Sequence, residues 1–209
     1  GSEMCIRDRK VISLPVNQGL GKALNEGLKH CSYDLVARMD TDDIAKPDRF
    51  EKQIRVFQEH PELDVVGAWI DEFEETTSNI ISTRKLPEVH DDICQFAKKR
   101  NPFNHPCVMY KKSAVEAVGS YQDFYLLEDY YLWLRMLMAG YQGYNIQEPL
   151  IHMRAGSDMY LRRAGWKYAK AQAKLFKFMK QQGFIGEGQY IKSLSLIHIS
   201  EPTRRTPIS

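Results

Sequence analysis

The chain has 209 residues, and 43% of them are hydrophobic, which is enough to bury the core of one domain of ordinary size. Its 29 lysines and arginines nearly balance its 27 aspartates and glutamates, so the overall charge gives no reason to expect a nucleic-acid partner. The four cysteines share no short spacing, and neither a disulfide framework nor a zinc site is indicated. No stretch approaches the roughly 18 consecutive apolar residues of a membrane span, and the N-terminus lacks the apolar core of a signal peptide. We therefore expect a cytoplasmic protein, either soluble or held at the inner face of the cell membrane.

The two ends of the chain differ from the rest. Residues 1–9 ("GSEMCIRDR") and 193–209 ("SLSLIHISEPTRRTPIS") show no periodicity that continues into their neighbours, and both resemble translated sequencing-library adapter. We expect them to be non-native tails. Residues 10–192 are then the domain, and Lys10 would begin in the middle of its fold.

Apolar patterns in the first third of the chain predict alternating strands and helices. A β-branched run at 10–16 is typical of a strand, and leucines spaced by four predict a helix over 20–28. The nearly continuous apolar run at 33–39 predicts a central parallel strand covered on both faces. Pro47 suits a first helical turn, and the apolar positions after it extend that helix to about His60.

The remainder predicts a mixed arrangement of strands and helices that ends in a long helix. Strands are expected at 63–73 and 79–86, joined as a hairpin across an acidic turn. The other expected elements are helix 88–100, strand 106–112, helix 126–141, strand 144–154 and a C-terminal helix at about 158–182 that Gly183 ends. Since there is no internal repeat and no low-complexity linker, one α/β domain is the economical prediction.

Three carboxylates, Asp40, Asp42 and Asp43, follow the apolar run at 33–39 directly. In a parallel sheet ligands bind beyond the carboxyl ends of the strands, and alternation along an extended chain puts Asp40 and Asp42 on the same side. Such a pair would suit Mg²⁺ or Mn²⁺. The alternative, that these acids cap the next helix or order a turn, stays open on spacing alone. A calcium loop is a poor third reading, because Ala45 replaces the glycine of its sharp turn.

A second acidic pair, Glu128 and Asp129, falls in the first turn of the helix expected at 126–141. Acids at a helix N-terminus stabilise it by about 0.3–1 kcal/mol, which would be sufficient reason for their presence. The other interpretation is a general base that faces a cleft and accepts a proton from a hydroxyl nucleophile.

Four segments together carry a resemblance to a known family: "NQGLGKALNEGL", "ARMDTDDIAKPDRFEKQI", "NPFNHPCVMYKKSAVEAVGSY" and "LLEDYYLWLRMLMAGYQGYNIQEPLIHMR". In order and spacing the chain resembles inverting family 2 glycosyltransferases of the GT-A fold over roughly residues 10–192. The resemblance implies a Rossmann-like α/β fold whose mixed sheet is flanked by helices. It also implies that the first strand–helix–strand unit, which holds the nucleotide's base and ribose in this family, is missing here.

The resemblance also implies roles for the two acidic pairs. Asp40 and Asp42 match the D-x-D motif, which holds a Mg²⁺ or Mn²⁺ ion against the diphosphate of a nucleotide-sugar donor, with Asp43 structural. Glu128 and Asp129 match the E-D motif, in which Glu128 contacts substrate and Asp129 is the base that deprotonates the acceptor hydroxyl. The sugar's anomeric configuration is then inverted.

Two further residues are weaker substrate-binding candidates. His105 would lie near the acceptor, although a buried structural histidine is the commoner case. Arg154 follows the last expected strand and could pair with a phosphate, and His152 is a fainter candidate for metal or phosphate.

The resemblance implies a nucleotide-diphosphate sugar donor, a UDP-sugar above all, and a saccharide or lipid-linked saccharide acceptor in bacterial cell-surface polysaccharide synthesis. A catalytically inactive fragment that only binds a sugar or a partner is the alternative. Lysines along one face of the C-terminal helix predict either peripheral membrane contact or an ordinary solvated face.

Overall fold

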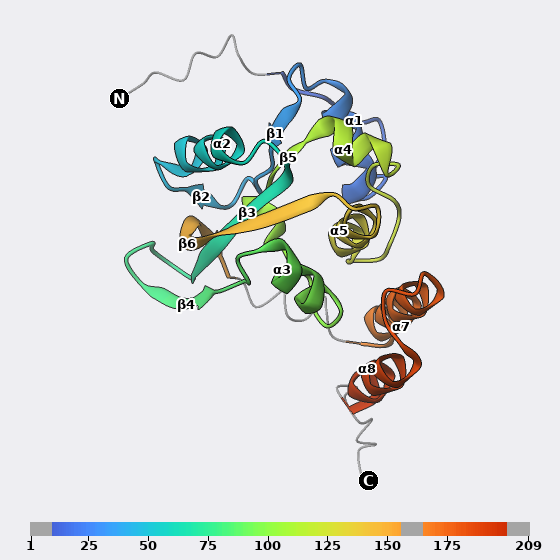
Figure 1. The fold of residues 1–209 in the computed structure, drawn as a ribbon. Helices are drawn as coiled ribbons and strands as arrows, with labels where there is room; N and C mark the ends of the chain where they lie inside the picture. Colours follow the sequence, from blue (N-terminus) through green and yellow to red (C-terminus); the bar gives the residue numbers. More distant parts are fainter. Residues whose placement is uncertain (1–9, 156–164, 200–209) are drawn as a thin grey trace.

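A computed structural model describes residues 10–155 and 165–199. Its centre is a six-stranded mixed sheet (Figure 1), in which β3 and β6 pair in parallel and the other pairs are antiparallel. The strands are β1 (Leu35–Ala37), β2 (Ile44–Ala45), β3 (Leu63–Phe73), β4 (Ile80–Arg84), β5 (Met109–Lys111) and β6 (Gln142–Arg154). Their order is β1-β5-β3-β6-β2, and β4 pairs with β3 as the predicted hairpin. The expectation of a mixed α/β sheet is confirmed.

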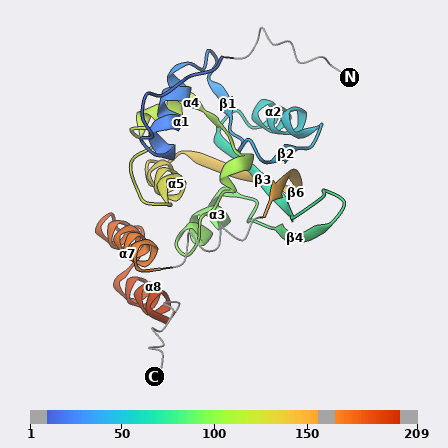
Figure 2. The ribbon, with the colours of Figure 1, turned by 180° about the vertical axis from the view of Figure 1, so that it is seen from behind.

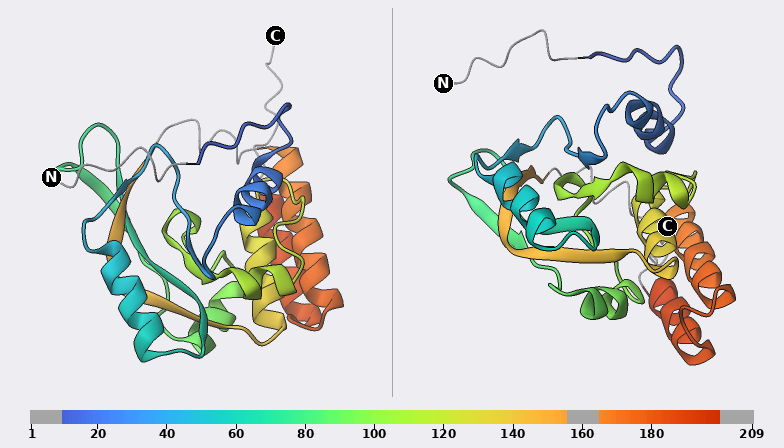
Figure 3. Two further views of the ribbon diagram at one scale, coloured as in Figure 1. Left: turned by 90° about the horizontal axis from the view of Figure 1, so that it is seen from above. Right: turned by 45° about the horizontal axis from the view of Figure 1, so that its top comes forward.

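The helices cover the sheet on two faces. They are α1 (Leu20–Lys29), α2 (Arg49–Glu59), α3 (His90–Ala97), α4 (Lys112–Ala117), α5 (Glu128–Met138), α7 (Trp166–Gln181) and α8 (Glu187–Ile199). Helix α2 lies on one side of the sheet and α1, α4 and α5 lie on the other, as the views from front and back show (Figures 1 and 2). Helices α5 and α7 run side by side (Figure 3), and the rings of Tyr131 and Phe178 meet between them at 4.9 Å.

The alternation of side chains along β3 separates two hydrophobic cores. Val65 packs with the helices of one face, and its neighbour Val66 packs on the other face with Phe57 of α2. The larger core surrounds Trp133 of α5, whose side chain is fully buried. Helix α5 is therefore fixed along its length, and its first turn, which carries Glu128, is held in a defined place.

Two sequence predictions for the front of the chain are wrong. Residues 10–16 form no strand, and Val11 and Val16 are 90% and 62% exposed, because no described segment pairs with them. The run at 33–39 supplies only the three-residue β1, at the edge of the sheet and antiparallel to β5. An apolar run has the same composition whether it lies at the centre or at the edge of a sheet, so composition could not place it.

The C-terminal part agrees with prediction in some respects only. Helix α7 begins at Trp166 and ends before Gly183, whose φ of +72° suits a glycine, whereas residues 158–164 of the expected helix lie outside the described part. Helix α8 continues past the expected domain end at 192 to Ile199. Residues 1–9 lie outside the described part, and residues 193–199 do not reveal the origin of the second expected tail, so both tails stay a prediction. Among the described residues, no helix is long and apolar enough to cross a membrane.

Aromatic rings account for much of the lysine-rich face of α7. The ammonium groups of Lys167 and Lys174 lie 4.0 and 4.9 Å from the ring centres of Tyr125 and Phe124. That of Lys180 pairs with Glu187 of α8 at 2.5 Å. These contacts give the lysine-rich face of α7 a structural role. Membrane contact stays a prediction.

Candidate active site

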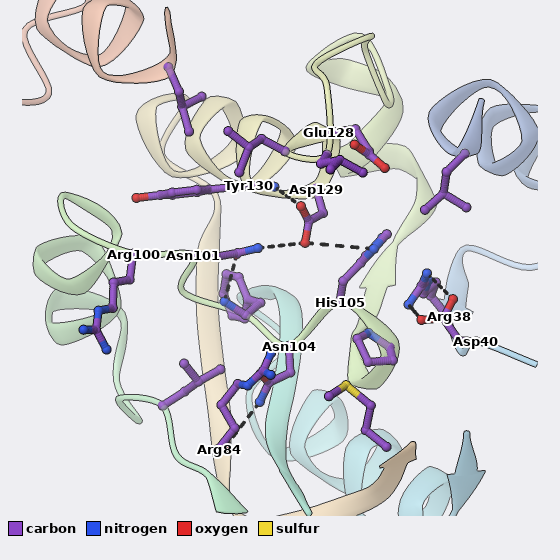
Figure 4. Close-up of a pocket in the computed structure, with 18 of the residues that line it drawn as sticks. Arg38, Asp40, Arg84, Arg100, Asn101, Asn104, His105, Glu128, Asp129 and Tyr130 are labelled. Carbon is purple, nitrogen blue, oxygen red and sulfur yellow. Dashed lines mark hydrogen bonds and ion pairs between the residues drawn. The ribbon is translucent and has the colours of Figure 1, made fainter. Parts of the chain in front are cut away.

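The predicted site residues gather around one cavity of about 970 Å³. Its wall is formed by the loop after β1, the segment from α3 to β5, the first turn of α5, the end of β6 and one face of α7 (Figure 4). It is lined by the residues predicted to bind substrate or metal, His152 excepted, and by Asp43: Asp40, Asp42, Asp43, His105, Glu128, Asp129 and Arg154. The two acidic motifs, distant in the sequence, therefore face a common space.

Arg38 fixes the first carboxylate of the acidic loop. Its buried guanidinium donates hydrogen bonds of 2.8 and 2.5 Å to the two oxygens of Asp40. This is a bidentate arrangement, which sets the plane of the carboxylate as well as its position. Asp42 is exposed on the same wall. Arg38 was not among the predicted residues, although an arginine inside an otherwise apolar run is itself an indication of a buried ion pair.

Asp43 points inward from the acidic loop. Its Oδ1 accepts a hydrogen bond of 3.1 Å from the backbone N–H of Arg154, while its Oδ2 is buried and has no hydrogen-bond partner. Burial raises the pKa of Asp43 to about 6, and the nearby charges of Asp40 and Asp42 act in the same direction. Asp43 thus joins the loop to the end of β6, with one oxygen left free for a donor or a cation.

Two polar residues of α2 hold the acidic loop from below. The buried Arg49 donates from Nη2 to the carbonyl of Arg38 at 2.7 Å and from Nε to Gln53 Oε1 at 3.0 Å. Gln53 in turn donates to the carbonyls of Val66 and Cys107, both at 3.0 Å. The spacing of this pair was one indication of its role, because Arg49 and Gln53 are four residues apart on the buried helix stripe that Phe57 continues.

Asp129 is held by two hydrogen bonds at the start of α5. Asn101 donates its side-chain amide to Oδ2 and the backbone N–H of Tyr130 donates to Oδ1, both at 2.7 Å (Figure 4). The carboxylate remains 18% exposed to the cavity. Each oxygen keeps a further lone pair, so the group can accept a proton from a bound hydroxyl. Asn101 was not predicted, although it is the first residue of the "NPFNHP" motif. Its hydrogen-bond partner, Asp129, comes close to it only in the folded chain.

His105 and Glu128 flank Asp129 in different environments. The His105 ring is buried, its Nε2 lies 3.0 Å from the Tyr121 hydroxyl and its Nδ1 lies 4.0 Å from Asp129 Oδ2. Burial lowers the pKa of His105 to about 4, so the ring is neutral at neutral pH. Burial also raises the pKa of Glu128, and the Asp129 charge adds to this. Both readings of His105, structural and near the acceptor, therefore agree with its place in the wall.

The two candidates at the end of β6 differ in position. The Arg154 guanidinium lies over the Phe73 ring at 4.8 Å and donates to the carbonyl of Glu74 at 3.1 Å, at the cavity wall. His152 is absent from that wall, and its Nδ1 lies 3.9 Å from Asp71 Oδ2. The faint expectation of a metal or phosphate role for His152 therefore finds no support in its position.

The acidic loop fits a hard divalent cation that a substrate helps to bind. No group of three or more His, Cys, Asp or Glu side chains in residues 10–155 and 165–199 could hold a metal by itself. Mg²⁺ is commonly bound by only one or two carboxylates together with substrate phosphates. The exposed carboxylate of Asp42 and the unpartnered oxygen of Asp43 are free oxygen donors, and the Asp40 oxygens keep lone pairs beyond those that accept from Arg38. Oxygen donors are what Mg²⁺ and Mn²⁺ prefer, and the substrate would supply the others.

The sequence is similar to those of bacterial glycosyltransferases. The model of the family described as glycosyl transferase family 2 matches residues 5–119. The amylovoran biosynthesis glycosyltransferase AmsE of Erwinia amylovora is 47% identical over 178 residues, 84% of this chain and 66% of that protein. The UDP-Gal:alpha-D-GlcNAc-diphosphoundecaprenol beta-1,3-galactosyltransferase of Escherichia coli is 38% identical over 182 residues, 87% of this chain and 66% of that protein. The chain thus spans just under two thirds of the length of these relatives.

Solved structures support the fold. S. aureus TarS 1-349 in complex with UDP-GlcNAc has a TM-score of 0.60 at 12% identity, over 86% of this chain and 52% of that one. The mannosyltransferase PcManGT from Pyrobaculum calidifontis in complex with GDP-Man and Mn²⁺ has a TM-score of 0.58 at 15% identity, over 88% and 50%. This likeness confirms the GT-A fold that the resemblance implied. With a family model over more than half of its length and a relative at 47% identity, the chain belongs to glycosyl transferase family 2.

Proposed function

We propose that this chain carries the catalytic part of an inverting, metal-dependent glycosyltransferase of bacterial cell-surface polysaccharide synthesis. The observation that carries the proposal is that the acidic loop with Asp40 and Asp42 lines the same cavity as Asp129. One motif can face the diphosphate of a nucleotide sugar while the other faces the attacking hydroxyl. The donor is a UDP-sugar, and the acceptor is a saccharide or a lipid-linked saccharide.

The names of the relatives support this choice of substrates. One solved structure holds UDP-GlcNAc and another holds GDP-Man with Mn²⁺. The E. coli relative is named for a UDP-Gal donor and a diphosphoundecaprenol-linked acceptor. Sugar nucleotides and lipid-linked acceptors are therefore used by proteins similar to this one.

In the proposed reaction Asp129 accepts the proton of the acceptor hydroxyl. The hydroxyl oxygen bonds to the anomeric carbon as the bond from that carbon to the donor's diphosphate oxygen breaks, and the nucleoside diphosphate leaves with the bonding electrons. Attack from the face opposite the leaving group inverts the anomeric centre. Asn101 and the Tyr130 N–H orient the base, and the neutral ring of His105 leaves Asp129 without a competing ion pair.

Arg38 and the cation have complementary roles at the donor end. Asp40 and Asp42, with Asp43 beside them, would hold Mg²⁺ or Mn²⁺, which when bound neutralises the charge that develops on the departing diphosphate. Arg38 keeps the Asp40 carboxylate in one orientation before a donor binds. The acidic loop is then arranged for the donor in advance.

Donor binding and transfer test the proposal separately. Isothermal titration with UDP-galactose and UDP-N-acetylglucosamine, with and without Mn²⁺, should show metal-dependent binding that Asp42→Ala abolishes. Asp129→Asn should keep donor binding and lose transfer by at least about a hundredfold, because it cannot accept the proton. Transfer at the wild-type rate by Asp129→Asn would remove it as the base. A chain that binds saccharides but no donor would instead be the inactive fragment.

A further inference from the structure

The cavity is charged differently at its two ends. The acidic loop forms one end, whereas four cationic side chains, from the end of β4 and the residue after it and from the segment after α3, line another part of the wall: Arg84, Lys85, Lys99 and Arg100. Figure 4 shows the Arg38–Asp40 pair on one side of Asp129 and Arg100 on the other, beyond Asn101. The proposed base therefore lies between an acidic and a basic region.

Two of these cations already have partners in the fold. Arg84 forms an ion pair and hydrogen bond with Glu72 across the β3–β4 hairpin. The Lys85 ammonium lies 4.9 Å from the ring centre of Trp69. Both cations are therefore held against residues of β3, and these contacts are a sufficient structural role for them.

Lys99 and Arg100 are different. Both are exposed, and no carboxylate of the described residues forms an ion pair with either side chain. Their backbone N–H groups both bond to the carbonyl of Phe96, at 2.9 and 3.0 Å, so the turn that carries them is ordered. Cations after a helix C-terminus also stabilise the helix, but by only about 0.3–1 kcal/mol, and this does not require them to line a cavity.

The stereochemistry of the proposed function places the acceptor at this end. An inverting attack brings the acceptor hydroxyl to the sugar from the side opposite the departing diphosphate. If Asp40 and Asp42 mark the diphosphate, the acceptor enters from the side of Asp129 where Arg100 lies. The same end has apolar and aromatic walls from α3 and α7, namely Phe96, Tyr168, Leu175 and Phe176.

We propose that Lys99 and Arg100 bind a phosphate group of the acceptor, so that the acceptor is a phosphate-bearing saccharide. The inference rests on the proposed function and deepens it. Arginine can take two phosphate oxygens at once, and the neighbouring lysine adds a second charge that no described carboxylate neutralises. The phosphate would link the saccharide to a second group, either an alkyl chain or a small soluble group. The apolar wall can contact that second group.

Equilibrium binding tests the proposal without a transfer step. The probe is N-acetylglucosaminyl diphosphate with a short alkyl chain, titrated in EDTA so that a cation in the acidic loop cannot hold it. The comparison ligands are the same alkyl glycoside without phosphate, N-acetylglucosamine 1-phosphate, and an alkyl glucuronide. We expect the double variant K99Q/R100Q to lose at least about tenfold in affinity for the diphosphate probe and nothing for the neutral glycoside.

The matched control is K22Q/R55Q, which removes the same charge from exposed positions of α1 and α2 that do not line the cavity. It should bind the probe like the wild type, and circular dichroism checks that both variants are folded. Stronger binding of the alkyl diphosphate than of the 1-phosphate identifies a lipid-linked acceptor, and equal binding identifies a soluble sugar phosphate; both support the phosphate site.

Several results would overturn the inference. These are unchanged affinity of K99Q/R100Q for the diphosphate probe, an equal loss in K22Q/R55Q, equal wild-type affinity for the neutral glycoside, or a glucuronide bound as tightly as the diphosphate. Titration of UDP-galactose with Mn²⁺ on the same variants separates the two proposals. Donor binding without a phosphate site refutes only this inference, and a phosphate site without donor binding refutes the proposed function.

Discussion

The buried carboxyl of Asp43 should make the protein less stable as the pH rises. Burial raises its pKa from an ordinary value of 3.8 to about 6, with the charges of Asp40 and Asp42 adding to the effect. A carboxyl with a raised pKa in the folded state binds its proton more tightly there than in the unfolded chain. Its contribution to stability is complete below pH 3.8 and is lost as the pH rises through about 6.

Asp43→Asn removes this ionisation and keeps the shape of the side chain. Its amide oxygen can still accept from the Arg154 N–H, and its amide nitrogen can take the place of the unpartnered Oδ2 beside the acidic neighbours. A displacement from 3.8 to about 6 corresponds to at most about 3 kcal/mol. Because Asp43 lines the cavity, where solvent weakens the effect of charge, we expect about 1–2 kcal/mol of stabilisation at pH 7.

Urea unfolding followed by circular dichroism, in EDTA between pH 4 and pH 7.5, measures the effect. The free energy of unfolding of Asp43→Asn should exceed that of the wild type by an amount that grows from pH 4 to pH 6 and is constant above. Glu75→Gln, at an exposed position between β3 and β4, is the control and should not raise the free energy of unfolding by a comparable amount. A difference that is independent of pH, or a variant that is less stable at pH 7, would refute the reasoning.

Two further substitutions test other parts of the structure. Asn101→Leu removes the amide that donates to Asp129 at 2.7 Å, so kcat should fall about tenfold or more with donor affinity unchanged, as steady-state kinetics and donor titration would measure; an unchanged kcat would contradict a positioning role. Gly67→Ala would bring its Cβ to 2.2 Å from the Asn145 Oδ1, so it should lower the free energy of unfolding by about 2 kcal/mol in urea titrations. Gly27→Ala, with no atom within 4 Å of the new Cβ, is its control and should not destabilise the protein.

The acidic motifs could be predicted from the sequence because their setting is local. Asp40 follows an apolar run and Asp129 opens a strongly periodic helix, and each position is defined by its immediate neighbours. That the two motifs face one cavity came from the family resemblance, and the structure places them so. The hairpin of β3 and β4 was also local, since a short acidic turn separates its strands.

The partners of these acids could not be predicted, because they come from folding. Asn101 meets Asp129 across 28 positions of sequence, and no spacing rule connects an amide in a loop to a carboxylate in a later helix. The failure at β1 has the same cause, since strand neighbours are set by the whole sheet. In the sequence Lys99 and Arg100 cannot be told from other surface charges, because only the fold shows that they line the cavity.

The Arg49–Gln53 pair beneath the acidic loop has a consequence for ligand affinity. Arg49 bonds to the carbonyl of Arg38 at the start of the loop, and Gln53 joins Arg49 to the carbonyls of Val66 and Cys107, so the start of the loop has less freedom to lose when a ligand arrives. The conformational entropy of this part of the loop is then lost when the protein folds and not when the ligand binds. Substitutions at Arg49 or Gln53, on the α2 side of the sheet, would therefore change ligand affinity without altering a residue that lines the cavity.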